Sequence, residues 1–185
     1  MTSDQPTAAP HFFSTHRLTV RGFELSDFED LARINASPTV SRYVDDGKPL
    51  SRDDVARWIE TSQENLARFG YGTGAVIHRS NGTLIGWAGF ARGPDPSDRS
   101  DEELIYGLDE PWWGQGLGTE LVAGLVRYAK RLAIAPLRAT VYRANHASIR
   151  VLERHGFVRA EADYRGDRGI DLYVVPEPAQ RTPRP

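Results

Sequence analysis

A chain of 185 residues with 39% hydrophobic and 26% charged side chains has the composition of a single globular domain. Its formal net charge of −2 argues against the bulk basicity of proteins that bind nucleic acid or anionic membranes, and we expect neither partner. The absence of cysteine excludes disulfides, thiolate zinc sites and a cysteine nucleophile. No apolar run approaches the roughly 20 residues of a membrane helix, and no signal-peptide pattern is present, so we expect a cytoplasmic protein.

The two ends differ in composition from the rest of the chain. Residues 1–10 are polar and contain two prolines, and the terminal stretch PEPAQRTPRP contains four. Proline disfavours both helix interiors and central strands. We therefore predict flexible tails at 1–10 and 176–185, with one domain at 11–175.

The first part of the domain predicts one strand and two helices. Residues 17–23 alternate polar and apolar side chains, which is typical of a half-buried strand. Ser26 with Glu29 has the spacing of a capping box and predicts the start of a first helix. Ser51 with Asp54 predicts the start of a second.

A run of strands follows. Residues 72–78 and 83–90 flank the dipeptide Asn81-Gly82, a strong signal for a tight hairpin turn. Residues 93–100 read as a loop, and residues 102–108 as another strand.

The second half alternates helices with strands. Apolar residues at helical spacing predict a helix at 117–132, and a shorter helix is expected at 148–155. Strands are expected at 137–143 and 172–175, and the stretch before the last one has room for another. Because a crossover helix joins parallel strands, the strands on either side of the first helix should be parallel. The pattern predicts an α/β domain with a mixed sheet.

A glycine-rich turn precedes the helix at 117–132. Gly114, Gly116 and Gly118 allow a sharp turn and leave backbone amides uncovered at the positive end of the helix dipole. Such a turn can hold a phosphate or pyrophosphate, and the alternative is a tight turn with no ligand. A Walker loop is excluded because Thr119-Glu120 follows the last glycine, and the glycine spacing does not fit the dinucleotide fingerprint.

A family resemblance resolves which ligand to expect. The stretch YGLDEPWWGQGLGTELVAGLVRYA, followed by NHASIRVLERHGF, resembles the two cofactor motifs of the GCN5-related N-acetyltransferase (GNAT) superfamily. It is most similar to the RimJ/RimL-type branch, which acetylates the N-termini of ribosomal proteins. The resemblance implies a single-domain GNAT fold: a mixed, mostly antiparallel sheet with helices on both faces and a splayed parallel strand pair at the cofactor site.

The resemblance also implies how acetyl-CoA binds. Backbone amides of the turn would hold the pyrophosphate, and the end of the preceding strand would pair with the pantetheine arm. The family carries Arg or Gln where this chain has Trp113, a departure that the ribosomal branch shares. The implied cofactor-binding residues are Gly107, Leu108, Asp109, Trp113, Gly114, Gln115, Gly116, Leu117, Gly118, Thr119 and Asn145.

Ser148 is the candidate proton donor to the departing thiolate, because the resemblance places it near the thioester sulfur. The usual tyrosine acid of the family is missing, since that position holds Leu152. A bound water is the alternative donor, and Ser148 is otherwise a first-turn serine that bonds its own backbone. Asn145 is expected to cap the same helix, and by resemblance also to bond the pantetheine arm.

Glu103 is the candidate base, acting on the amine through water by resemblance to the branch. The alternative is a solvated acid at a strand end. In a regular strand Glu102 points to the opposite face from Glu103, and Tyr106 points to the same side as Glu102.

We therefore predict direct transfer of acetyl from acetyl-CoA to a primary amine, with a protein or peptide N-terminal α-amine as the leading acceptor. The alternatives are a small amine such as an antibiotic, polyamine or amino acid, and a non-catalytic acyl-CoA-binding regulatory module. The histidines show no metal-ligand spacing, so no metal is expected. The expected oligomeric state is a monomer or a homodimer.

Overall fold

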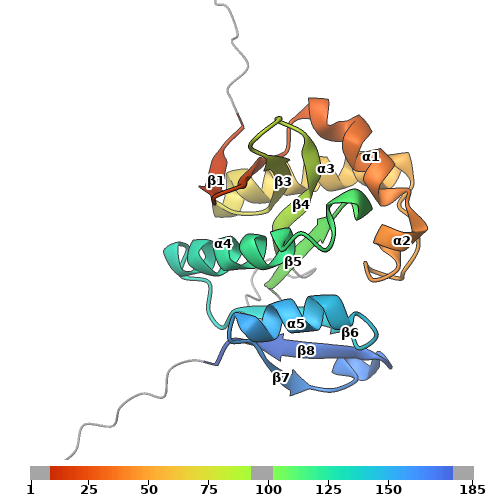
Figure 1. The fold of residues 1–185 in the computed structure, drawn as a ribbon, viewed down its shortest axis with the longest axis vertical. Helices are drawn as coiled ribbons and strands as arrows, with labels where there is room; N and C mark the ends of the chain where they lie inside the picture. Colours follow the sequence, from red (N-terminus) through yellow and green to blue (C-terminus); the bar gives the residue numbers. More distant parts are fainter. Residues whose placement is uncertain (1–8, 93–101, 177–185) are drawn as a thin grey trace, which may run out of the picture.

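The computed structural model describes residues 9–92 and 102–176 of the chain. The predicted loop at 93–100 and nearly all of the two predicted tails lie outside these residues. The described residues form one sheet with helices on both of its faces, which confirms the predicted α/β class (Figure 1).

Eight strands of the described chain form this sheet, in the order β1-β2-β3-β4-β5-β6-β8-β7. The strands are β1 (His11–Ser14), β2 (Leu18–Gly22), β3 (Thr73–His78), β4 (Leu84–Ala91), β5 (Glu103–Leu108), β6 (Arg138–Tyr142), β7 (Val158–Glu161) and β8 (Ile170–Val174). The helices are α1 (Phe28–Asn35), α2 (Pro38–Ser41), α3 (Arg52–Phe69), α4 (Leu117–Arg131) and α5 (His146–Arg154), with 3₁₀ turns η1 (Leu25–Asp27), η3 (Glu110–Trp112) and η4 (Tyr164–Gly166). Neighbouring strands are antiparallel except β5 and β6, so the predicted mixed, mostly antiparallel sheet is confirmed.

The predicted start of α3 is confirmed. The Ser51 hydroxyl accepts the backbone N–H of Asp54, and the Asp54 carboxylate accepts the backbone N–H of Ser51. The apolar stripe that follows faces the core, where Val55 and Ile59 are buried. Local capping and the hydrophobic period therefore indicate the same helix.

The predicted start of α1 is wrong. The capping box is formed not by Ser26 and Glu29 but two residues earlier, where Glu24 and Asp27 cap the 3₁₀ turn η1. Asp27 accepts the backbone N–H of Glu24 and also binds the Arg21 guanidinium at 2.7 Å. Asp27 therefore serves both the cap and an ion pair with Arg21 of β2, and the spacing of Ser26 and Glu29 reveals neither contact.

The two edge strands were the hardest to predict, because neither alternates. β1 buries the adjacent residues Phe12 and Phe13, and its register against β2 is irregular between His11 and Phe13. All four residues of β7 are exposed, so this strand has no apolar face. β1 was therefore not predicted, and β7 was anticipated only as room for one more strand before the last.

The sheet separates two layers of core. On one face α4 packs through Leu121 and Leu125 into a cluster that includes Phe90. On the other face α1 and α3 pack through Leu31 and Ile59 into a cluster that includes Trp87. Figure 1 shows α4 crossing the face of the central strands and α5 lying over β6 and β8.

The centre of the sheet contains a fork. Helix α4 connects β5 to β6, and the two strands are parallel, as the crossover predicts. Among the described residues they pair only at Glu103 and Arg138. Towards Leu108 and Tyr142 they diverge, so the carboxyl ends of two central strands stand apart where α4 and α5 begin.

Gly124 provides a test of the packing under α4. Alanine is the better helix former by roughly 1 kcal/mol, so Gly→Ala in a helix interior ordinarily stabilises. A Cβ at Gly124 would lie 2.2 Å from Cε2 of the buried Phe13 ring. We expect Gly124→Ala to lower the free energy of unfolding by about 1–3 kcal/mol, measured by urea denaturation. Gly118→Ala, on the same helix with 3.9 Å of clearance, is the control that should not destabilise.

Candidate active site

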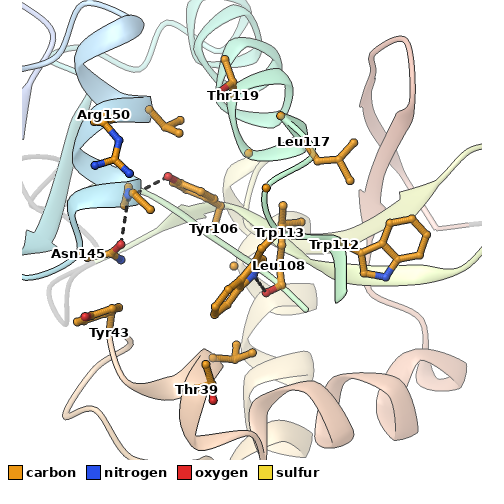
Figure 2. A pocket seen from close by; sticks show the side chains of 18 of the residues that line it. Thr39, Tyr43, Tyr106, Leu108, Trp112, Trp113, Leu117, Thr119, Asn145 and Arg150 are labelled. Carbon is orange, nitrogen blue, oxygen red and sulfur yellow. Dashed lines mark hydrogen bonds between the residues drawn. The ribbon is translucent and has the colours of Figure 1, made fainter. Parts of the chain in front are cut away.

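A cavity of about 560 Å³ lies beside the end of β5, where this strand diverges from β6 and where α4 and α5 face each other. Its walls come from the end of β5, the glycine-rich turn, the starts of α4 and α5, and the segment around α2 (Figure 2). The predicted cofactor-binding residues that line it are Gly107, Leu108, Trp113, Gly114, Gly116, Leu117, Gly118, Thr119 and Asn145. The fold therefore gathers nine residues that the resemblance implied around one cavity.

The turn at the start of α4 has the geometry of an anion cradle. Gly116 is the N-cap of α4 and has a φ of +75°, a conformation that favours glycine. A Cβ at Gly118 would meet nothing closer than the Tyr106 ring at 3.9 Å, so the first turn of α4 faces open space. The amides at a helix start have no partner within the helix, and they suit a phosphate group.

Asp109 and Gln115 do not line this cavity. The Asp109 carboxylate caps η3 by accepting the N–H of Glu110, and it binds Arg33 at 2.7 Å. The Gln115 side chain donates to the carbonyl of Pro111. Both side chains stabilise the turn. Contact of these two residues with a cofactor stays a prediction, and it would have to be made by their backbone groups.

Trp113 has a structural partner. Its indole N–H donates to the carbonyl of Leu108 at 2.7 Å, which ties the turn to the end of β5 (Figure 2). The ring also lines the cavity. An aromatic residue at this position therefore braces the turn, where an arginine or glutamine would offer a polar group to the ligand.

Arg17 supports the turn from behind. Its Nε binds the Glu120 carboxylate at 2.7 Å, and its Nη1 donates to the carbonyl of Gln115. Glu120 also accepts the hydroxyl of Thr15. These contacts tie the start of β2 to the start of α4 and fix the cradle to the sheet.

Ser148 and Tyr106 form a hydroxyl pair beside the fork. The Ser148 Oγ lies 2.9 Å from the Tyr106 hydroxyl, which reaches across from β5 to α5 (Figure 2). Burial raises the pKa of the Tyr106 phenol above its ordinary value, and the hydrogen bond to Ser148 opposes this rise. The phenol therefore keeps its proton at neutral pH and can act as a donor.

Asn145 caps α5 as predicted. Its side-chain oxygen accepts the backbone N–H of Ser148 at 3.2 Å. This contact fixes the first turn of α5 and with it the position of the Ser148 hydroxyl. Leu152, at the position of the missing tyrosine, is buried.

A second cavity, of about 570 Å³, lies on the α3 side of the fork and is lined in part by Glu103. The Glu103 carboxylate accepts hydrogen bonds from the hydroxyl of Thr140 at 2.7 Å and from its backbone N–H at 3.3 Å. Glu103 thus bridges β5 and β6 where they separate, and it also presents a carboxylate to the cavity. Trp58, Trp87 and Tyr106 contribute aromatic walls.

The two cavities meet at one place. The residues that line both are Tyr43, Val44, Tyr106, Asn145 and Ser148. Two ligands, one in each cavity, would therefore approach each other beside the Ser148 and Tyr106 hydroxyls.

The two cavities carry opposite charge. The charged residues that line the first are Arg150 and Arg154 alone. The second is lined by Asp45, Asp54 and Glu103 against a single cation, Arg57, which lies 3.3 Å from Asp54. The first cavity suits an anion, and the second suits a cation.

Three features of this site were missing from the sequence prediction. Strand alternation places Tyr106 on the face that also carries Leu104, but nothing local shows that α5 brings Ser148 to its hydroxyl. The segment with Tyr43 follows a short helix, and only the fold carries it to the fork. The spacing of Arg150 and Arg154 in α5 gives no functional signal, and only the structure shows that both line the cavity.

Within the described part of the chain, no three His, Cys, Asp or Glu side chains come together as a metal ion requires. None of the helices in that part is long and apolar enough to span a bilayer.

Comparisons with known proteins agree on one family. A family model described as an acetyltransferase (GNAT) domain matches residues 17–158. The "Putative phosphinothricin acetyltransferase YwnH" of Bacillus subtilis is 29% identical over 143 residues, which cover 76% of this chain and 83% of that protein. An acetyltransferase structure from Agrobacterium tumefaciens is similar with a TM-score of 0.77 at 25% identity, covering 96% of this chain and 100% of the other. The ribosomal L7/L12 α-N-protein acetyltransferase RimL is similar in fold, with a TM-score of 0.73 at 15% identity over 90% of this chain and 93% of the other.

Proposed function

The chain belongs to the GNAT acetyltransferase family, and from this premise we propose that it transfers acetyl directly from acetyl-CoA to a primary amine of a small molecule. The family makes it an acetyl-CoA-dependent acyltransferase. Direct transfer is supported by the meeting of the two cavities beside Ser148 and Tyr106.

The lining and the charge of the first cavity support acetyl-CoA as its ligand. It offers free amides at the start of α4, open space beside Gly118 and two arginines. Acetyl-CoA supplies the acyl group: the amine nitrogen forms a C–N bond as the C–S bond breaks, the nitrogen loses a proton and the sulfur gains one.

The chain's residues then have distinct tasks. Ser148 donates a proton towards the sulfur, and Tyr106, held protonated by burial, returns one to Ser148 through their hydrogen bond. Glu103 takes the amine proton through water from the second cavity. The carboxylates of that cavity attract the ammonium form of the acceptor before it is deprotonated.

The size and lining of the second cavity support a small acceptor. Its volume of about 570 Å³ falls within the range of roughly 300–1,000 Å³ that is usual for small-molecule sites. Aromatic walls with a few charged groups are typical of such sites. The similarity to YwnH, which is named as a phosphinothricin acetyltransferase, supports the same class of acceptor.

The second candidate acceptor is a peptide or protein N-terminal α-amine. It is supported by the resemblance of the cofactor motifs to the RimJ/RimL-type branch. With a pKa of about 8, an α-amine also needs less help from a base than a lysine amine near 10.4. A cytoplasmic location and a monomeric or homodimeric state likewise remain predictions from the sequence.

An acceptor panel tests the proposal. Release of CoA would be measured with phosphinothricin, free amino acids, polyamines and short peptides, each beside its N-blocked form as a control. We expect at least one small amine to give a kcat/KM about 100-fold above any peptide, and blocked amines to be inert. Turnover of peptides alone would favour the second candidate, and no transfer to any free amine would contradict both.

A further inference from the structure

The positive charge of the first cavity comes entirely from α5. Arg150 and Arg154 line it, and no acidic residue does. Four residues apart, they lie on the same side of the helix. Both side chains are exposed, and neither makes an ion pair within the described residues. Figure 2 shows Arg150 extending from α5 at the edge of the cavity.

The glycine-rich turn itself supplies no cation to the cavity. Trp113 occupies the position where the family pattern has arginine or glutamine, and its indole N–H is already bonded to Leu108. Arg17 is the guanidinium nearest to Gly116, but it is paired with Glu120 and does not line the cavity. The cationic side chains available to a polyanion in this cavity are therefore those of α5, opposite the glycine-rich turn.

The end of α5 lies next to the start of α4. His155 Nε2 is 2.9 Å from the carbonyl of Thr119, and because a carbonyl can only accept, Nε2 carries the proton of this bond. The contact places the helix turn that carries Arg154 beside the amides of the cradle. Arginine and a helix start would thus face the same ligand from two sides.

We propose that Arg150 and Arg154 bind the phosphate groups of acetyl-CoA and supply the charge that the turn lacks at Trp113. The inference rests on the proposed function, because it takes acetyl-CoA as the occupant of the cavity. Guanidinium groups form strong, paired hydrogen bonds to phosphate oxygens, whereas backbone amides contribute only partial charges. The amides and the arginines therefore share the diphosphate and the ribose 3′-phosphate between them.

Affinity measurements on three ligands test this assignment. Dissociation constants for CoA, dephospho-CoA and pantetheine would be measured for the wild type, Arg150→Gln, Arg154→Gln and the double variant. Arg127→Gln removes the same charge from an exposed position on α4 outside the cavity and serves as the control. Urea denaturation of each variant would verify that it folds as the wild type does.

We expect each single variant to weaken CoA binding by about tenfold and the double variant by about 100-fold, while Arg127→Gln changes little. Pantetheine, which has no phosphate, should bind all variants alike. A penalty that persists with dephospho-CoA assigns the arginines to the diphosphate, and one that disappears assigns them to the 3′-phosphate. The difference in CoA affinity between the wild type and the double variant should become smaller as the salt concentration is raised.

Two results would overturn the assignment: equal CoA affinity in all variants, or an equal penalty with pantetheine. If the wild type itself fails to bind CoA, both the proposed function and this assignment are contradicted. Normal wild-type binding with unaffected arginine variants removes this assignment alone.

Discussion

Replacing Gly118 with tryptophan is expected to weaken acetyl-CoA binding more than about 100-fold while leaving the fold intact. A side chain at Gly118 starts in open space, 3.9 Å from Tyr106, and both residues line the first cavity. An indole there would occupy the volume that the cofactor needs. Gly118 does not have a positive φ, so the substitution adds no backbone strain, as a change at Gly116 would.

Gly118→Ala is the matched control, because its methyl group fits at ordinary contact distance. We expect it to bind acetyl-CoA nearly as the wild type does and to unfold at slightly higher urea concentration, since alanine favours the helix. Calorimetric titration with acetyl-CoA measures both variants. If the tryptophan variant bound acetyl-CoA normally, the cofactor would have to lie elsewhere and the assignment of the cavity would fail.

Removing the hydroxyl of Ser148 or of Tyr106 is expected to lower kcat about 100-fold, the usual lower range for loss of a general acid. The two hydroxyls lie 2.9 Å apart at the junction of the cavities, and we propose that a proton passes between them. Ser148→Ala and Tyr106→Phe each delete a single oxygen, so affinity for acetyl-CoA should change little. Initial rates with an identified acceptor give kcat, and calorimetry gives the affinity.

The double variant separates a relay from two independent contributions. If both hydroxyls serve one proton transfer, the double variant should be no slower than the slower single variant, because effects within one network are not additive. Multiplied losses would show that the two act separately. Wild-type rates in Ser148→Ala would reduce Ser148 to a helix-turn residue and leave water as the donor.

The sequence predicted the elements whose local signals agree with their environment. The hairpin at Asn81-Gly82, the capped helix α3 and the crossover helix α4 each bring their own pattern of turn residues or apolar spacing. β1 was missed because it buries two adjacent phenylalanines, and the cap before α1 was misplaced because Asp27, which also pairs with Arg21 of β2, forms it with Glu24. In both cases neither strand alternation nor the spacing of Ser26 and Glu29 indicates the structure that forms.

The residues of the candidate site also fall into those that local sequence signals predict and those that only the fold brings together. Gly116, Gly118 and Asn145 were predictable because their roles depend on backbone geometry at helix starts, which leaves a local signature. The partnership of Ser148 with Tyr106 was not predictable, since two elements 42 residues apart must first be brought together. The opposite charge of the two cavities was not predictable either, because it depends on which side chains the fold brings to each cavity.

The fork between β5 and β6 is a place where the chain gives up sheet structure. A strand pair joined along its whole length would gain hydrogen bonds and bury more backbone, yet here the two strands part after Glu103 and Arg138. Natural sequences commonly tolerate such losses where activity requires them. Selection for stability alone would favour pairing along the whole length of both strands. Such pairing would remove the opening beside which the two cavities meet.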